Sequence, residues 1–232
     1  MAHSHSHTEP QAQLQRPGHQ VLDQFPQLQE LMAANEKWAG EIKAREPELL
    51  ETLSKGQAPK ILWIGCADSR VPESVILARN PGEVFVLRNV ANQFRPDDDS
   101  ANGLLEYAVG PVGVEHVIVC GHSGCGGCVV AHGLPNPKFE ENDTSDTPLM
   151  RFIEPIVTLR HSLEGTCTVD KLIEENVKVG VRNVVASEAM RNSWARAGRG
   201  EGKKVWVHGW VYDIKSGRLR DLGISVGPPE HE

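Results

Sequence analysis

The feature that most constrains the fold of this chain is a series of short apolar segments that alternate with longer amphipathic ones. Three of the short segments read KILWIG, EVFVLR and EHVIVCG. Apolar runs of this length are typical of buried β-strands. KVWVHGWVYDI predicts a fourth strand, and Gly217 followed by the stretch from Leu219 to Leu222 predicts a hairpin to a fifth. The predicted strands cover residues 60–65, 83–88, 115–121, 204–214 and 219–222.

The segments between these strands have the periodicity of helices. The predicted helices cover residues 72–79, 100–110, 127–132, 148–162, 169–179 and 181–196. Strands that alternate with helices predict an α/β fold with a mainly parallel central β-sheet flanked by helices. The last hairpin would add an antiparallel edge strand. The polar stretch 133–148 is rich in proline, asparagine and aspartate and is predicted to be a surface loop.

The N-terminal region is organised differently. Residues 1–20 are polar and without periodicity, which predicts a flexible tail. Residues 21–232 are predicted to form a single domain, in which residues 21–53 are an N-terminal helical arm. Two helical patterns lie in this arm, at 23–34 and 35–53. Pro47 indicates a break near its position. The apolar side chains of the arm need a surface to pack on, either the main domain or a partner subunit.

Composition and charge exclude several classes of partner. The formal net charge is −7 and the basic residues are scattered, so we expect neither a nucleic-acid partner nor an anionic membrane surface. No apolar run approaches the ~20 residues that a membrane span needs. The first 20 residues lack the apolar core of a secretory signal and contain a single arginine, Arg16. The expected location is therefore cytoplasmic.

Cysteine and histidine side chains follow two of the predicted strands directly. Cys66 comes after the first strand, and His122 and Cys125 come after the third. The carboxyl ends of parallel strands meet at one rim of the sheet, so we expect these three side chains to lie together. Two thiolates and one imidazole are a typical donor set for zinc. The sequence therefore predicts Zn²⁺ bound by Cys66, His122 and Cys125.

The residues around these ligands suggest that the zinc is catalytic. Three protein ligands leave one tetrahedral position open, which is typical of catalytic rather than structural zinc. Asp68 is close enough in sequence to reach the metal itself, but a bidentate pair with Arg70 would hold its carboxylate off the zinc. A helix that begins after Cys125 is expected to lower the pKa of that thiol.

Other interpretations of these motifs remain open at this point. Cys125 and Cys128 form a C-x-x-C pair that a thiol-redox protein could use, although we place Cys128 on the following helix, turned away from the metal. The glycine-rich turn 121–127 could bind a nucleotide, but it lacks the P-loop lysine and does not fit GxGxxG. A zinc-stabilised fold without activity is a third alternative. Cys120 and Cys167 are assigned to structure.

Once these residues are assembled, the sequence closely resembles the β-class carbonic anhydrases over residues 30–225. The resemblance is carried by CADSR, PGEVFVLRNVAN, GHSGCGG and HGWVYDI, at 66–70, 81–92, 121–127 and 208–214. It implies zinc on Cys66, His122 and Cys125 and an Asp68–Arg70 catalytic dyad. It implies the reversible hydration of carbon dioxide to bicarbonate and a proton, by attack of a zinc hydroxide. A related heteroallene such as carbon disulfide is an alternative substrate, since the metal chemistry is the same.

The resemblance also implies roles for residues outside the metal cluster. Gln57 matches a glutamine that hydrogen-bonds substrate, often across a subunit interface. The residues implied to line the carbon dioxide pocket are Phe85, Val90 and Tyr107. Those that match a second, non-catalytic bicarbonate site in some members are Trp63, Arg88 and Tyr212. The alternative for these three is a core tryptophan, an ion-pair partner and a strand-capping tyrosine. The helical arm is implied to embrace a second subunit in a homodimer or homotetramer.

Overall fold

The computed structural model describes residues 24–136 and 147–229, and the predicted flexible tail lies outside them. The chain divides into two compact units, residues 1–55 and residues 56–232. The first unit contains α1 (Pro26–Arg45) and α2 (Leu49–Ser54). The predicted boundary at residue 35 is wrong, because Ala33 and Ala34 are strong helix formers and nothing there interrupts the helix. The predicted break near Pro47 is confirmed, since the residue before a proline disfavours helical geometry.

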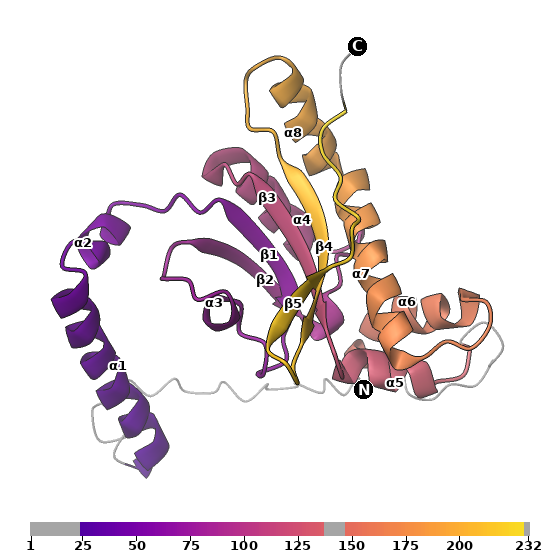
Figure 1. Cartoon of the computed structure of the whole chain (residues 1–232), viewed down its shortest axis with the longest axis horizontal. Helices are drawn as coiled ribbons and strands as arrows, with labels where there is room; N and C mark the ends of the chain where they lie inside the picture. Colours follow the sequence, from indigo (N-terminus) through magenta and orange to yellow (C-terminus); the bar gives the residue numbers. More distant parts are fainter. Residues whose placement is uncertain (1–23, 137–146, 230–232) are drawn as a thin grey trace, which may run out of the picture. The chain divides into compact units, whose positions relative to one another are not determined.

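The second unit is built on a five-stranded sheet, seen in Figure 1. Its strands are β1 (Ile61–Cys66), β2 (Val84–Asn89), β3 (His116–His122), β4 (Trp206–Asp213) and β5 (Arg218–Asp221). The strand order is β2-β1-β3-β4-β5, with β1 to β4 parallel and β5 antiparallel to β4. This confirms the predicted α/β fold with a mainly parallel sheet and an antiparallel edge strand.

The helices of this unit lie where the sequence predicts them, with differences at their ends. They are α3 (Glu73–Ile76), α4 (Asp99–Tyr107), α5 (Gly126–Gly133), α6 (Pro148–Ser162), α7 (Val169–Ala186) and α8 (Glu188–Gly198). The predicted boundary at residue 180 is wrong. Gly180 stays inside α7 because the helix needs close approach to the sheet there: a Cβ on Gly180 would lie 2.9 Å from Cγ1 of Val119. The break comes at Ser187, whose hydroxyl caps α8 by accepting from the N–H of Met190.

The two faces of the sheet carry different cores. On one face, fully buried side chains such as Leu62, Ile64 and Val119 pack with α7 through Val177 and Val181. On the other face a smaller cluster gathers Trp63, Ile118 and Cys120 next to Leu77, which follows α3. Figure 1 shows α7 running along β4, and it also contacts β3. Cys120 is buried within the sheet, as its structural assignment predicts.

The strand order determines where in the sheet a ligand-binding site is expected. The chain moves from β1 to its neighbour β2 on one side and then to β3 on the other side. In open α/β sheets, ligands bind outside the carboxyl ends of the strands at the point where the direction of strand addition reverses, which here lies between β1 and β3. Both strands end on residues that the sequence singled out, Cys66 and His122.

Among the helices described, none is long and apolar enough to cross a bilayer.

Candidate active site

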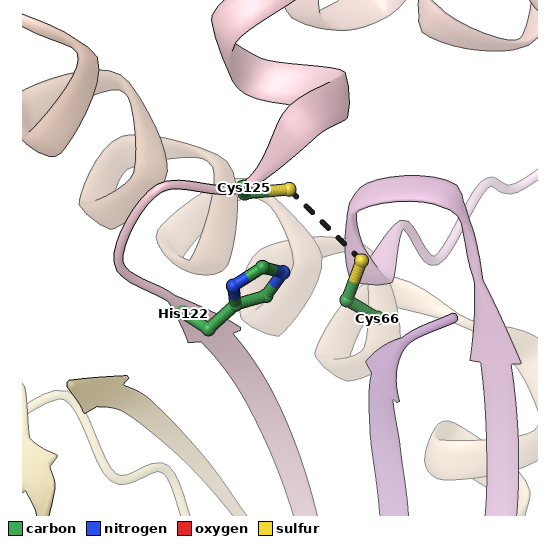
Figure 2. A group of neighbouring side chains, drawn as sticks. All are labelled: Cys66, His122 and Cys125. Atoms are coloured by element: carbon green, nitrogen blue, oxygen red, sulfur yellow. Dashed lines mark hydrogen bonds between the residues drawn. The ribbon is translucent and has the colours of Figure 1, made fainter. Parts of the chain in front are cut away.

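The structure brings Cys66, His122 and Cys125 together at the carboxyl ends of β1 and β3. Cys66 ends β1, His122 ends β3, and Cys125 is the N-cap residue of α5. One donor atom from each lies within 4.8 Å of the others, and the two sulfurs are 4.0 Å apart. All three side chains are buried. Figure 2 shows the imidazole of His122 lying beside the two thiols, one from the strand and one from the start of the helix.

The donor set fits a zinc ion. Nδ1 of His122 lies 3.1 Å from the carbonyl oxygen of Ser123, so a proton on Nδ1 is satisfied there. Nε2 is then left with a lone pair, and this buried atom has no hydrogen-bond partner in the described part of the chain. A buried acceptor without a partner is costly unless something else occupies it. Two sulfurs and an imidazole lone pair facing one another are what zinc prefers.

The thiols strongly favour their protonated forms when no cation is present. A hydrogen bond with Cys125, followed by burial, raises the pKa of the Cys66 thiol to about 12. The pKa of Cys125 is raised to about 11, first by its hydrogen bond with Cys128. Without a metal, the hydrogen bond with Cys128 and burial thus raise the pKa of Cys125, although this residue lies at the start of α5. Zinc binding must release these protons, which makes metal affinity fall in acid.

Cys128 lies on α5, as predicted, and it is buried. Its sulfur is not part of the three-donor group. The group that could hold a metal is therefore Cys66, His122 and Cys125 without Cys128.

Asp68 and Arg70 form the bidentate pair that their spacing predicts. Nε of Arg70 donates to Oδ1 of Asp68 at 2.9 Å and Nη2 donates to Oδ2 at 2.7 Å. The guanidinium also donates to the carbonyl of Gly124, in the turn between two predicted ligands. The hydrogen bonds from Arg70 hold the pKa of Asp68 well below its usual range. Oδ2 of Asp68 lies 3.9 Å from Nε2 of His122, so an ionised carboxylate faces the donor group.

Arg88 holds the loop between Cys66 and Asp68. Its Nε donates to the carbonyl of Cys66 at 2.9 Å and its Nη2 to the carbonyl of Asp68 at 2.6 Å. Its Nη1 lies 3.7 Å from Oε2 of Glu73. The sequence predicted an ion-pair partner as one alternative for Arg88, but it did not predict these hydrogen bonds to the loop. Trp63 is a core residue that folds over Gly65, where a Cβ would lie 2.2 Å from the indole nitrogen.

Ser123 and Asp213 form a second support that sequence reasoning missed. The hydroxyl of Ser123 donates to Oδ1 of Asp213 at 3.1 Å and accepts from the N–H of Ile214 at 2.9 Å. The N–H of Ser123 donates to the carbonyl of Tyr212. The turn after His122 is thereby fastened to the end of β4. The sequence offered one indication of this contact. Ser123 and Asp213 both lie near the ends of predicted strands, and these two strands are neighbours in the sheet.

The remaining implied site residues occupy three different places. The rings of Phe85 and Tyr107 are 6.0 Å apart. Val90 lies against the turn after Cys125, since a Cβ on Gly127 would be 3.0 Å from its Cγ1. Gln57 is exposed before the start of β1, and the strand places roughly 17 Å between its first residue and Cys66. The structure therefore does not bring Gln57 to the metal cluster of its own chain.

Comparison with known proteins identifies the family. Residues 61–219 match the family model described as carbonic anhydrase. A carbonic anhydrase of Emericella nidulans is 36% identical over 201 residues, which cover 84% of this chain and 83% of the relative. A tetrameric β-carbonic anhydrase of Sordaria macrospora superposes with a TM-score of 0.73 at 34% identity, covering 86% of this chain and 98% of that one. The β-carbonic anhydrase of Coccomyxa, solved with acetazolamide, gives 0.75 at 34% identity over 86% and 87%. The chain therefore belongs to the β class of the carbonic anhydrase family.

Proposed function

We propose that this chain is a zinc-dependent carbonic anhydrase that interconverts carbon dioxide with bicarbonate and a proton. The observation that carries the proposal is the buried group of Cys66, His122 and Cys125 with the Asp68–Arg70 pair beside it. Carbon dioxide hydration is the function of the family to which the chain belongs. Bound by these three residues, zinc would supply the Lewis acidity that lowers the pKa of water toward the neutral range.

The protein's own groups position the attacking water. Asp68 has no proton to give, because its hydrogen bonds with Arg70 keep it ionised. Its carboxylate faces the donor group and is a hydrogen-bond acceptor for the water that attacks carbon dioxide. Accepting that hydrogen bond directs a lone pair of the water oxygen toward the substrate carbon. Arg70 keeps the carboxylate in this orientation and off the metal.

The substrate pocket is proposed to be apolar and completed by a second subunit. Phe85 beside Tyr107, and Val90 beside the turn after Cys125, would give carbon dioxide apolar walls, which suit an uncharged substrate. Gln57 lies at the far end of β1 from Cys66, which supports a role in the partner's site rather than its own. This assignment makes the complete site dependent on assembly.

A homodimer or homotetramer is the proposed assembly. Four large apolar side chains of the first unit, Phe25, Leu28, Leu31 and Met32, are each between 43% and 66% exposed. A contiguous set of this kind on one helical segment is typical of an interaction surface. The Sordaria macrospora enzymes are described as tetrameric. The proposed location is cytoplasmic, which is supported by the two thiol ligands, since a reducing compartment keeps them able to bind zinc.

The non-catalytic bicarbonate site remains a proposal of lower priority. Trp63 and Tyr212 belong to one cluster on the sheet, and the register places Arg88 beside Gly65 on the same face. The contacts that Arg88 makes are those of the structural alternative, with two carbonyls and Glu73. Loss of bicarbonate inhibition in Arg88→Ala, with zinc retained, would support an anion site.

The deciding experiment is a stopped-flow assay of carbon dioxide hydration on protein of measured zinc content. We expect hydration with about one zinc per chain, and parallel carbon disulfide hydrolysis at a much lower rate. Cys66→Ser should lose most of the zinc and most of the activity, because one of three ligands is removed. A Cys66→Ser protein with full zinc and normal hydration would refute the site. Hydrolysis of carbon disulfide without hydration of carbon dioxide would favour the heteroallene alternative.

A further inference from the structure

A pair of histidines lies on the sheet away from the active site. Nδ1 of His116, the first residue of β3, is 3.0 Å from Nε2 of His208 on β4, and the ring centroids are 5.2 Å apart. In the register, His208 is opposite Ile118, so both histidines project from the same face. β3 rises roughly 20 Å between His116 and His122. The pair is therefore at the opposite end of the strand from the zinc ligand.

The surroundings of His208 leave a lone pair on its Nε2, on the side that faces His116. Nδ1 of His208 is 2.8 Å from the hydroxyl of Ser225. A proton on Nδ1 that is donated to this hydroxyl leaves the lone pair on Nε2, which faces His116. Metal-binding histidines usually have such a partner on the second ring nitrogen, which fixes the tautomer and the ring orientation. Burial, followed by the charge of His116, lowers the pKa of His208, which favours the neutral form that binds metals.

The separation of the two nitrogen atoms also suits one shared ion. Metal–nitrogen bonds of about 2.0–2.1 Å at adjacent coordination positions place two nitrogens roughly 2.9–3.4 Å apart. The observed 3.0 Å falls in this range. The carboxylate of Asp221 is close enough to act on the charge of His208 and would partly offset that of a cation.

We propose that His116 and His208 form a second metal site, which takes a divalent transition-metal ion with water in the remaining positions. Imidazole is a good ligand for zinc, nickel and copper. His116 is exposed and His208 is half-buried, so the site exchanges with solvent. With two protein ligands instead of three, it binds its ion more weakly than the buried cluster of Cys66, His122 and Cys125 and fills after it.

The test is calorimetric titration of the zinc-loaded full chain with zinc chloride. Histidines 3, 5 and 7 are replaced by alanine in every arm, because tail histidines would also bind zinc. We expect one further zinc per chain. His116→Gln and His208→Gln should each weaken this binding by ~10-fold or more, since an amide retains hydrogen bonding but is a poor ligand. His161→Gln, which removes a histidine elsewhere, should bind as the parent does.

Three results would overturn the proposal. The first is a parent protein that takes up no zinc beyond the active site, which would leave the pair as a simple hydrogen bond. The second is unchanged binding in either His116→Gln or His208→Gln, provided that each retains its catalytic zinc. The third is equal weakening in His161→Gln. A second readout uses one equivalent of Cu²⁺ on the zinc-loaded parent: the electron paramagnetic resonance spectrum should show coupling to two imidazole nitrogens, and coupling to one would contradict the shared site.

Discussion

At the scale of single residues, the loop between Cys66 and Asp68 depends on an arginine from another strand. Arg88 lies on β2 and donates hydrogen bonds to two carbonyls of this loop. Glu73 lies beside its guanidinium. Oε2 of Glu73 is buried and makes no hydrogen bond in the described part of the chain, so Arg88 is the cation that offsets it. Removing Arg88 would leave both the carbonyls and the carboxylate unsupported.

We therefore expect Arg88→Met to lower the free energy of unfolding by about 3 kcal/mol, the cost of breaking a largely buried pair. Urea denaturation at pH 7 measures this change. Arg79→Met is the matched control, because Arg79 pairs with Glu83 in an exposed position. That variant should lose less than about 1 kcal/mol. Equal losses in the two variants would contradict a buried supporting role for Arg88.

The link between Ser123 and Asp213 leads to a prediction about zinc retention. Ser123→Ala removes the hydroxyl that joins the ligand turn to Asp213 and to the N–H of Ile214. We expect zinc to leave this variant about 10 to 100 times faster, because groups behind metal ligands tune affinity by that factor. The measurement is the rate of zinc transfer to a chelator. Ser216→Ala also removes a hydroxyl from Asp213 but leaves Ser123 in place, so its rate should match the parent. An unchanged rate in Ser123→Ala would count against the link.

His208 gives a prediction about pH. Burial lowers its pKa in the folded state, so the unfolded chain binds a proton at higher pH than the folded chain does. The folded state is thus favoured above the unfolded pKa of about 6.5 and loses this advantage as the pH falls below it. His208→Gln should therefore lose less stability than the parent between pH 7.5 and 5.5. Thermal denaturation across this range, at fixed zinc, measures the difference, and parallel curves would disprove it.

The cluster of Cys66, His122 and Cys125 could be predicted from the sequence, whereas most of the contacts that support it could not. Cys66 and His122 directly follow strongly apolar strands, so the rule for carboxyl ends of parallel strands was sufficient. The hydrogen-bond partners of the Arg88 and Ser123 side chains lie 20 to 91 residues away in the chain. Those contacts exist only because β2, β1, β3 and β4 are neighbours in that order, which periodicity does not reveal.

At the scale of secondary-structure elements, two glycines in helices differ in what surrounds them. Gly180 in α7 faces Val119, whereas a Cβ on Gly103 in α4 would meet nothing within 4 Å. Sequence periodicity treats both as weak helix positions. The helix boundary near Gly180 was mispredicted for this reason. A glycine is needed at this position because α7 packs closely on β3, and the helix does not end there.

Replacing each glycine by alanine should have opposite effects. Gly103→Ala should stabilise the protein by up to about 1 kcal/mol, through helix propensity alone. In Gly180→Ala the same gain is opposed by the contact with Val119, and overpacking of this kind costs about 1–3 kcal/mol. Chemical denaturation of the two variants beside the parent tests this. A stabilised Gly180→Ala protein would show that the sheet and α7 separate easily.

At the scale of the whole molecule, the first unit carries large apolar side chains that this unit does not itself bury. Leu31 and Met32 on α1 are 66% and 57% exposed. We expect the double variant Leu31→Glu, Met32→Glu to weaken assembly at micromolar concentration, because burying two carboxylates is costly. Light scattering measures the mass. Lys43→Glu adds negative charge to the same helix and should leave assembly intact. A parent protein with the mass of one chain would refute the proposed oligomer.

The path of the chain from β1 through β2 to β3 also bears on when the newly made protein can take up zinc. Cys66 leaves the ribosome well before His122 and Cys125, and β2 with its neighbouring helices is made in between. A zinc ion that met Cys66 during synthesis would find one weak ligand and no pocket. Capture by all three residues would wait until β3 has docked beside β1, a contact between segments distant in sequence that is slow to form. Metal loading would then report that the central sheet is complete, and binding would stabilise the strand pairing.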